Sequence, residues 1–138
     1  MRTFSLLFAG VAILSTAVPA AAATRAARPT PEQRLAKLLA GRVAGEPVHC
    51  ISLRDIRSSE IIDGTAIVYR TGGNRLYVNR PRGGAQQLDY DDVLVTRTST
   101  SQLCSIDIVR LVDRTSRFET GFVSLDDFVP YARPATGR

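Results

Sequence analysis

The sequence predicts a mainly β (α+β) domain: a small antiparallel curled sheet or barrel of about six strands with one short N-terminal helix. Short β-rich segments recur between turn residues from position 50 onward. One capped amphipathic segment precedes them. The chain has 138 residues, which is the length of a single domain with a modest core.

The first 23 residues have the pattern of a secretory signal peptide. A basic start at Arg2 is followed by an apolar run from Leu6 to Val18, a proline and four alanines. The run is shorter than the roughly 20 residues that a membrane-spanning helix requires. We therefore expect cleavage after Ala22 or Ala23, export to the periplasm, and no membrane span in the mature chain. The alternative is an uncleaved N-terminal anchor.

The expected organisation has four parts. They are a signal peptide (1–23), a linker with a short amphipathic helix (24–45), a single β-rich domain (46–133) and a tail (134–138). The helix begins at a capping box, in which Thr30 is the cap, Pro31 occupies the first turn and Gln33 closes the box. Gly41 is a natural stop. A helix this short must pack on the sheet to be stable.

Strand signals follow in order along the domain. Residues 56–80 predict a three-stranded meander, with Asp63-Gly64 and the Thr71–Asn74 segment as its turns. Further strands are expected at 93–97, 106–113 and 118–125. The last apolar residues are expected to tuck under the sheet; they are Phe128, Val129 and Tyr131.

The two cysteines, Cys50 and Cys104, both follow the export signal. Two cysteines in an exported protein usually form a disulfide. In the chain-entropy account, closing a loop of this size stabilises the fold by about 4 kcal/mol. The alternative is a pair of free thiols, although no C-x-x-C spacing supports a redox role.

The positive net charge of the chain is only a weak indication of its binding partners. The formal net charge is +5, and of 18 basic residues only Lys37 is a lysine. Such an arginine bias usually follows codon usage, and the arginines are scattered among acidic neighbours. We expect no nucleic-acid partner, because a nucleic-acid surface gathers its cations around aromatic side chains. A weaker alternative is an anionic-surface binder that gathers Arg75, Arg80, Arg82 and Arg97 on one face.

No catalytic residue is predicted. His49 is the single histidine, and no serine lies in a nucleophile motif. The densest acidic cluster, Asp89–Asp92, lacks EF-hand spacing and reads as a turn. One histidine and two paired cysteines leave too few ligands for zinc, so neither a metal nor a cofactor is expected.

One sheet face offers a candidate ligand site. Tyr69, Tyr77, Asn79 and Arg80 are expected to share it, and such groups bind sugars or peptides as readily as they cover an ordinary exposed face. Asp107 lies in an otherwise apolar segment. It must therefore either point to solvent or be buried and hydrogen-bonded.

Four motifs in fixed order resemble a proteobacterial family of small exported proteins that form a domain of unknown function. They are Cys50–Ile51, Tyr77–Asn79, Leu103–Asp107 and Ser124–Pro130. Many members carry two further cysteines, where this chain has Gly84–Ala85 and Val123–Ser124. The resemblance implies that Cys50 and Cys104 remain as partners. It implies no activity.

The sequence therefore favours a non-enzymatic exported domain that binds a partner or small ligand or serves structurally in the envelope. The first alternative is a small hydrolase or lyase that works through carboxylates and arginines. It predicts that two carboxylates from Asp107, Asp113 or the Asp89–Asp92 cluster face one cleft.

Overall fold

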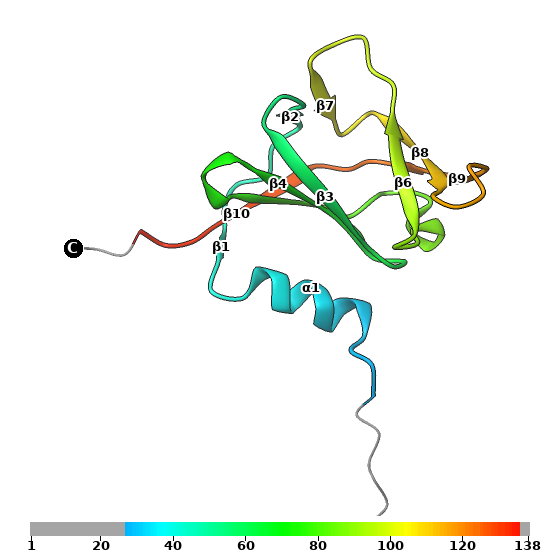
Figure 1. Ribbon diagram of the computed structural model, residues 1–138. Coiled ribbons are helices and arrows are strands. Elements are labelled where there is room, and N and C mark those ends of the chain that lie inside the picture. Colours follow the sequence, from blue (N-terminus) through cyan, green and yellow to red (C-terminus); the bar gives the residue numbers. More distant parts are fainter. Residues whose placement is uncertain (1–26, 136–138) are drawn as a thin grey trace, which may run out of the picture.

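The computed structural model describes residues 27–135, so the predicted signal peptide lies outside the described residues. Within this range, ten short strands form three antiparallel sheets, and one helix precedes them (Figure 1). The sheets do not close into a barrel. The predicted mainly β class with one leading helix is confirmed. No helix of the described part is long and apolar enough to cross a membrane.

Helix α1 (Pro31–Leu39) forms as its sequence predicts. The Thr30 hydroxyl accepts the N–H of Gln33 at 3.2 Å, and the Gln33 side chain accepts the N–H of Thr30 at 2.8 Å. Gly41 follows with φ +71°, a conformation that glycine adopts without a Cβ penalty. The helix buries Leu35 against the sheet, so packing supplies the stability that its length does not.

The strands have short, turn-bounded ranges. They are β1 (Val43–Ala44), β2 (Cys50–Ser52), β3 (Ile56–Ile62), β4 (Ala66–Thr71), β5 (Leu76–Asn79), β6 (Asp92–Thr96), β7 (Gln102–Cys104), β8 (Ile108–Asp113), β9 (Glu119–Ser124) and β10 (Phe128–Ala132). Two 3₁₀ turns, η1 (Gly72–Asn74) and η2 (Ala85–Gln87), interrupt them. β1 lies in the segment that the sequence assigns to linker and helix alone.

The largest sheet has the order β1-β10-β5-β4-β3. The meander predicted for residues 56–80 forms as β3, β4 and β5, with a register irregularity between Ile56 and Ser58. The second sheet has the order β6-β8-β9, and the third is the two-stranded pair β2-β7. Figure 1 shows α1 on one side of the largest sheet and β6, β8 and β9 on the other.

The C-terminal strand β10 corrects the expectation that its apolar residues merely tuck under the sheet. It lies inside the largest sheet, between β1 and β5. Pro130 hides this strand in the sequence because proline donates no ladder bond. The Gly45 N–H donates to the Pro130 carbonyl at 2.8 Å, so Pro130 directs its backbone toward the β1 side. There β1 has only two residues, and the missing donor is tolerated.

Alternation along β3, β4 and β5 divides the core into two clusters. One face holds Ile62, Ala66, Val68, Leu76 and Val78 against Leu35 of α1. The opposite face joins the residues of the other two sheets in a larger cluster, which includes fully buried Phe128. Because successive side chains point to opposite faces, one meander supplies both clusters.

Candidate functional site

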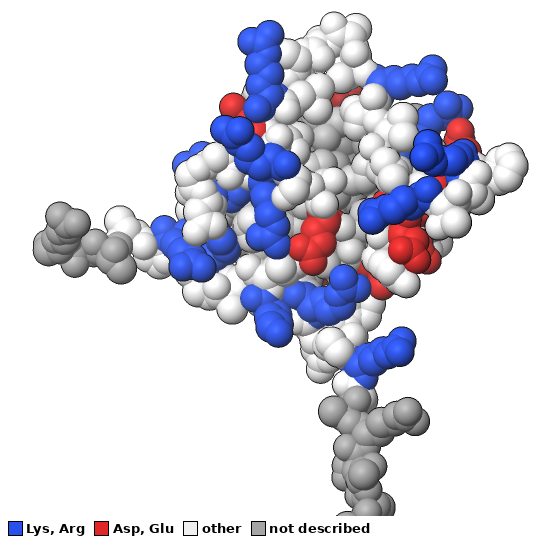
Figure 2. Space-filling model, viewed as in Figure 1, with Lys and Arg blue, Asp and Glu red and all other residues white. Residues whose placement is uncertain are grey.

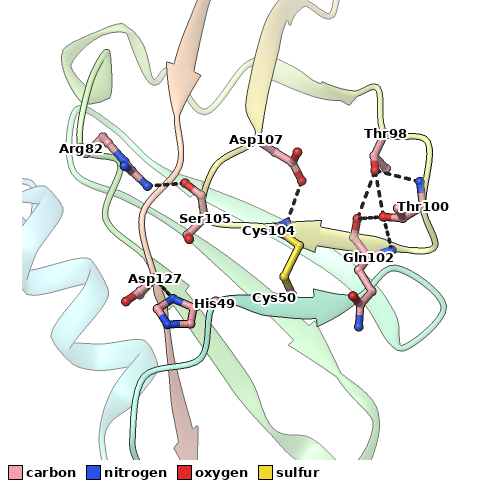
Figure 3. The surroundings of a disulfide bond; sticks show 10 residues. All are labelled: His49, Cys50, Arg82, Thr98, Thr100, Gln102, Cys104, Ser105, Asp107 and Asp127. Carbon is pink, nitrogen blue, oxygen red and sulfur yellow. Dashed lines mark hydrogen bonds and ion pairs between the residues drawn. A yellow bond between two sulfur atoms is a disulfide. The ribbon is translucent and has the colours of Figure 1, made fainter.

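The disulfide joins β2 to β7. Cys50 and Cys104 are direct partners in the antiparallel register, and their sulfurs are bonded (Figure 3). The Ser105 N–H donates to the His49 carbonyl at 2.7 Å, just outside this pair. The cysteines therefore form a non-hydrogen-bonded pair, the kind whose Cα atoms lie closest, here 4.0 Å apart. A disulfide of this kind fits an oxidising compartment.

Asp107 stabilises the turn that follows the disulfide. Its Oδ2 accepts the N–H of Cys104 at 2.7 Å, and its own N–H donates to the Cys104 carbonyl at 3.0 Å (Figure 3). The Cys104 N–H points away from β2 because of the pairing described above, so the carboxylate supplies its partner. The half-buried Asp107 is thus hydrogen-bonded within its own turn.

His49 contacts a carboxylate beside the disulfide. Its Nδ1 lies 2.7 Å from Oδ1 of Asp127 (Figure 3). The hydrogen bond from His49 holds the pKa of Asp127 below its usual value, with smaller contributions from the Ser105 hydroxyl and the charge of Arg82. The His49 side chain is 82 % exposed. A general base acts on a substrate held within a site, whereas this imidazole stands on an open surface.

A closed seam joins the end of β5 to the turn between β9 and β10. Asn79 is fully buried, and its side chain accepts the Asp126 N–H at 3.2 Å and donates to the Asp126 carbonyl. Arg82 donates from Nε to the Leu125 carbonyl at 2.7 Å. The Ser124 N–H donates to the Gly83 carbonyl at 2.9 Å. These hydrogen bonds connect the largest sheet to the β6-β8-β9 sheet along one side.

The four residues predicted to form a ligand face have different environments. Tyr69, Tyr77 and Asn79 do share one face, but that face points toward the interior. Tyr69 packs edge-on against Phe128, with ring centroids 5.9 Å apart, and burial raises the pKa of its hydroxyl. Tyr77 is half-buried and lines two shallow clefts beside Arg75.

Arg80 lies apart from the other three. It forms two hydrogen bonds with Glu32 of α1, at 2.8 and 3.0 Å. Those bonds hold the pKa of the Glu32 carboxyl below its usual value. Arg80 therefore anchors the helix to the sheet. The arginine group of the anionic-surface alternative is divided as well, because Arg82 belongs to the closed seam.

The carboxylates of the hydrolase alternative have separate partners: Asp89, Asp107 and Asp113 bond within their own turns, whereas Asp92 lies in β6 and accepts the Thr120 hydroxyl. Asp113 accepts the N–H groups of Thr115 and Ser116, and Asp107 accepts that of Cys104. Asp89 accepts the N–H of Asp91 at 2.9 Å, as expected for a turn. Within residues 27–135, no group of three histidine, cysteine or carboxylate side chains is arranged to hold a metal ion.

A basic groove lies between α1 and the edge of the largest sheet. Its volume is about 570 Å³, within the range of ligand-binding clefts. The charged side chains that line it are five bases and one acid, namely Arg34, Lys37, Arg42, Arg70, Arg133 and Glu60. Figure 2 shows basic side chains gathered over α1 and the neighbouring strands.

Internal partners account for part of this charge. Arg70 lies 2.9 Å from Glu60, and Arg34 lies 3.2 Å from Asp63. Lys37 and Arg133 have no acidic partner within 4.0 Å among the described residues. The groove therefore keeps an excess of positive charge. No local sequence motif indicates the groove, because its residues come from α1, β3, β4 and the two ends of the domain.

The sequence signal that could have located the groove is the spacing of Arg34 and Lys37 on one side of the predicted helix. Residues three apart share a helix face. That face is basic here, and the opposite one carries Leu35 and Leu39. Comparison with models of protein families, with curated proteins and with solved structures found no match. The function is therefore inferred from the geometry of this chain.

Proposed function

We propose that this chain is an exported, non-enzymatic periplasmic domain that binds an anionic ligand in the basic groove between α1 and the largest sheet. The observation that carries the proposal is the lining of five bases and one acid around a cleft of 570 Å³. A cleft lined by one sign of charge concentrates ligands of the opposite sign. Support for export is the predicted signal peptide together with the disulfide.

The groove favours a ligand with several negative charges. Arginine binds phosphate and carboxylate oxygens through two parallel donors, and lysine adds a compact charge. Lys37 and Arg133 are the side chains best placed to meet such a ligand, because neither has an internal ion pair in the described residues, whereas Arg42 donates to the carbonyl and side chain of Asn74. Arg34 and Arg70 are held in position by Asp63 and Glu60.

Titration calorimetry of the mature protein with inorganic tripolyphosphate tests the proposal. The variant Lys37→Glu/Arg133→Glu is expected to weaken binding about tenfold, because two free cations of the groove become anions. The matched control is Arg54→Glu/Arg97→Glu, which reverses the same number of charges on exposed residues outside the groove lining. The control is expected to stay within about twofold.

Binding should also weaken as salt is raised from about 50 to 200 mM, because the contacts are between exposed charges. Equal weakening by the groove variant and the control would show that net charge alone attracts the ligand. That result, or the absence of tripolyphosphate binding at low salt, would contradict the proposal.

A further inference from the structure

Two strand edges that have no partner strand within residues 27–135 face one groove. β3 ends the largest sheet, and β6 ends the β6-β8-β9 sheet. Between them lies an open seam, a groove of about 390 Å³. Figure 2 views the face on which this hollow opens. Its lining includes Ser59, Glu60 and Ile61 from β3 and Asp92, Val93 and Leu94 from β6.

The hydrogen-bond register shows which backbone groups of β6 point into the open seam. The Arg114 N–H donates to the Asp91 carbonyl at 3.2 Å, just beyond the Asp92–Asp113 pair. That pair is therefore non-hydrogen-bonded, and bonding alternates from residue to residue along the ladder. Val93 and Val95 bond to β8, whereas the N–H and C=O of Leu94 point away from it.

The hydrogen-bond register also shows which backbone groups of β3 point into the open seam. The Thr71 N–H donates to the Arg75 carbonyl at 3.0 Å, so Tyr69 bonds toward β5. Ser59 and Ile61 stand opposite Tyr69 and Ile67, and their backbone groups therefore point away from β4. Within the described residues, no backbone hydrogen bond covers these groups of Ser59, Ile61 or Leu94.

A buried carboxylate in the wall of the groove adds an independent observation. Asp92 is 5 % exposed, and its Oδ1 accepts the Thr120 hydroxyl at 3.0 Å. Its Oδ2 is buried without a hydrogen-bond partner among the described residues. A buried oxygen of this kind costs free energy unless a donor reaches it. The groove therefore presents a buried acceptor, Oδ2 of Asp92, in addition to the two strand edges.

The outer edge of β9, by contrast, is protected. On the outer edge of β9, the Phe122 N–H donates to the Gln87 side chain at 3.1 Å, and Ser124 pairs with Gly83. Proteins commonly cover or distort an edge in this way because a free edge pairs with other strands. Ser59 to Ile61 keep a regular register, since the irregularity of β3 lies before Ser58.

We infer that the open seam binds an extended segment of a partner polypeptide, which adds a strand between β3 and β6. Backbone groups of Ser59, Ile61 and Leu94 would bond to it, and a donor of the added strand would reach Asp92. Strand addition takes its affinity from the main chain and its specificity from alternate side chains. This inference concerns a second groove, which shares Arg34 and Glu60 with the basic groove, and it does not depend on the proposed function.

The surroundings indicate the chemistry of the partner. Ile61 and Leu94 pack into the larger core cluster, so alternate residues of the added strand should be apolar. Asp63 accepts the Tyr90 N–H at 2.9 Å and pairs with Arg34, which places the end of β3 beside the start of β6. Arg34 and Arg114 line this end of the groove, so the partner should carry an acidic residue there.

Peptide selection on the mature protein tests the inference. One pool contains acetylated six-residue peptides in which apolar and polar residues alternate before a final glutamate. The control pool has the same composition, with the apolar residues consecutive. We expect enrichment from the alternating pool alone. A version of the selected peptide that is N-methylated at alternate backbone nitrogens should bind at least about tenfold more weakly.

Hydrogen exchange then locates the selected peptide. It should slow exchange about tenfold at the amides of Ser59, Ile61 and Leu94, and less than about twofold at Val93 and Val95, which already bond to β8. Ser59→Pro removes an edge donor without breaking a bond to β4, and should weaken binding about tenfold. Ser59→Ala, which keeps the donor, is the matched control and should bind normally.

Three results would overturn the inference. They are no enrichment from the alternating pool, equal binding of the N-methylated peptide, and protection of residues outside the open seam. If Ser59→Pro does not fold, the N-methylated peptide still decides the question, because it tests the same hydrogen bonds from the side of the ligand.

Discussion

The closed and open seams between the two larger sheets differ in whether their polar groups have hydrogen-bond partners. Along the closed seam, Asn79, Arg82 and Gly83 bond to the backbone of the end of β9 and the turn after it, so hydrogen bonds join the two sheets there. Along the open seam, the backbone groups of Ser59 and Leu94 face each other's strand without a partner. The same fold thus has one side completed by its own side chains and another available to a strand from outside.

The disulfide belongs to this comparison because the loop that it closes contains both strands of the open seam. Replacing Cys50 and Cys104 by serine should destabilise the protein by about 4 kcal/mol in the chain-entropy account. Urea unfolding with and without reductant measures this loss. Reductant should affect the native protein and leave the double variant unchanged. A native protein that is insensitive to reductant after unfolding would contradict the expectation.

Two glycines with positive φ give the next largest effect; Gly64 lies in the turn between β3 and β4, and Gly84 lies beside the closed seam. A Cβ on Gly84 would lie 2.3 Å from the Phe122 carbonyl oxygen, whereas a Cβ on Gly64 would meet nothing within 4 Å. Gly64→Ala should cost about 1 kcal/mol for its backbone conformation alone. Gly84→Ala should cost about 3 kcal/mol, because β9 must also shift. Equal losses of unfolding free energy for the two variants, measured by thermal or urea unfolding, would show that β9 shifts at the closed seam without loss of stability.

Asn79 tests the hydrogen bonds of the closed seam. Asn79→Ala should lower the free energy of unfolding by about 2 kcal/mol, since it removes both hydrogen bonds that the fully buried Asn79 side chain forms with the Asp126 backbone. The exposed Gln86 offers a control, because Gln86→Ala should change stability by less than about 0.5 kcal/mol. Hydrogen exchange at Asp126 should rise together with the loss. Unchanged exchange there would place the destabilisation elsewhere.

The smallest expected effect is the acid dependence of the His49–Asp127 contact. The pKa of Asp127 is lowered in the folded protein, so its contribution to stability is present in full above the unfolded value of 3.8. It is lost as the pH falls from there through the lower folded pKa. Asp127→Asn should therefore flatten the decline of the urea midpoint below pH 3.8. The pKa of Asp113 is also lowered in the folded protein, so part of the decline of the urea midpoint should remain in Asp127→Asn.

Prediction from sequence worked where the signal is local. The Thr30 capping box and the meander around Asp63-Gly64 depend on neighbouring residues, and both form as expected. It failed for β10, where Pro130 masks a strand that only its partners β1 and β5 reveal. The four residues of the predicted ligand face illustrate the same limit. Alternation correctly put Tyr69, Tyr77 and Asn79 on one side, but it could not say which side is covered.

The sequence by itself therefore determined the class of the fold, its leading helix and its meander, because period, capping and turn chemistry act over a few residues. Tertiary structure alone decided that Cys50 faces Cys104 in register and that Asp107 bonds to the turn after it. It also gathered the bases of the groove from distant segments and left the β3 and β6 edges open. Those features depend on how the sheets pack, which no local pattern records.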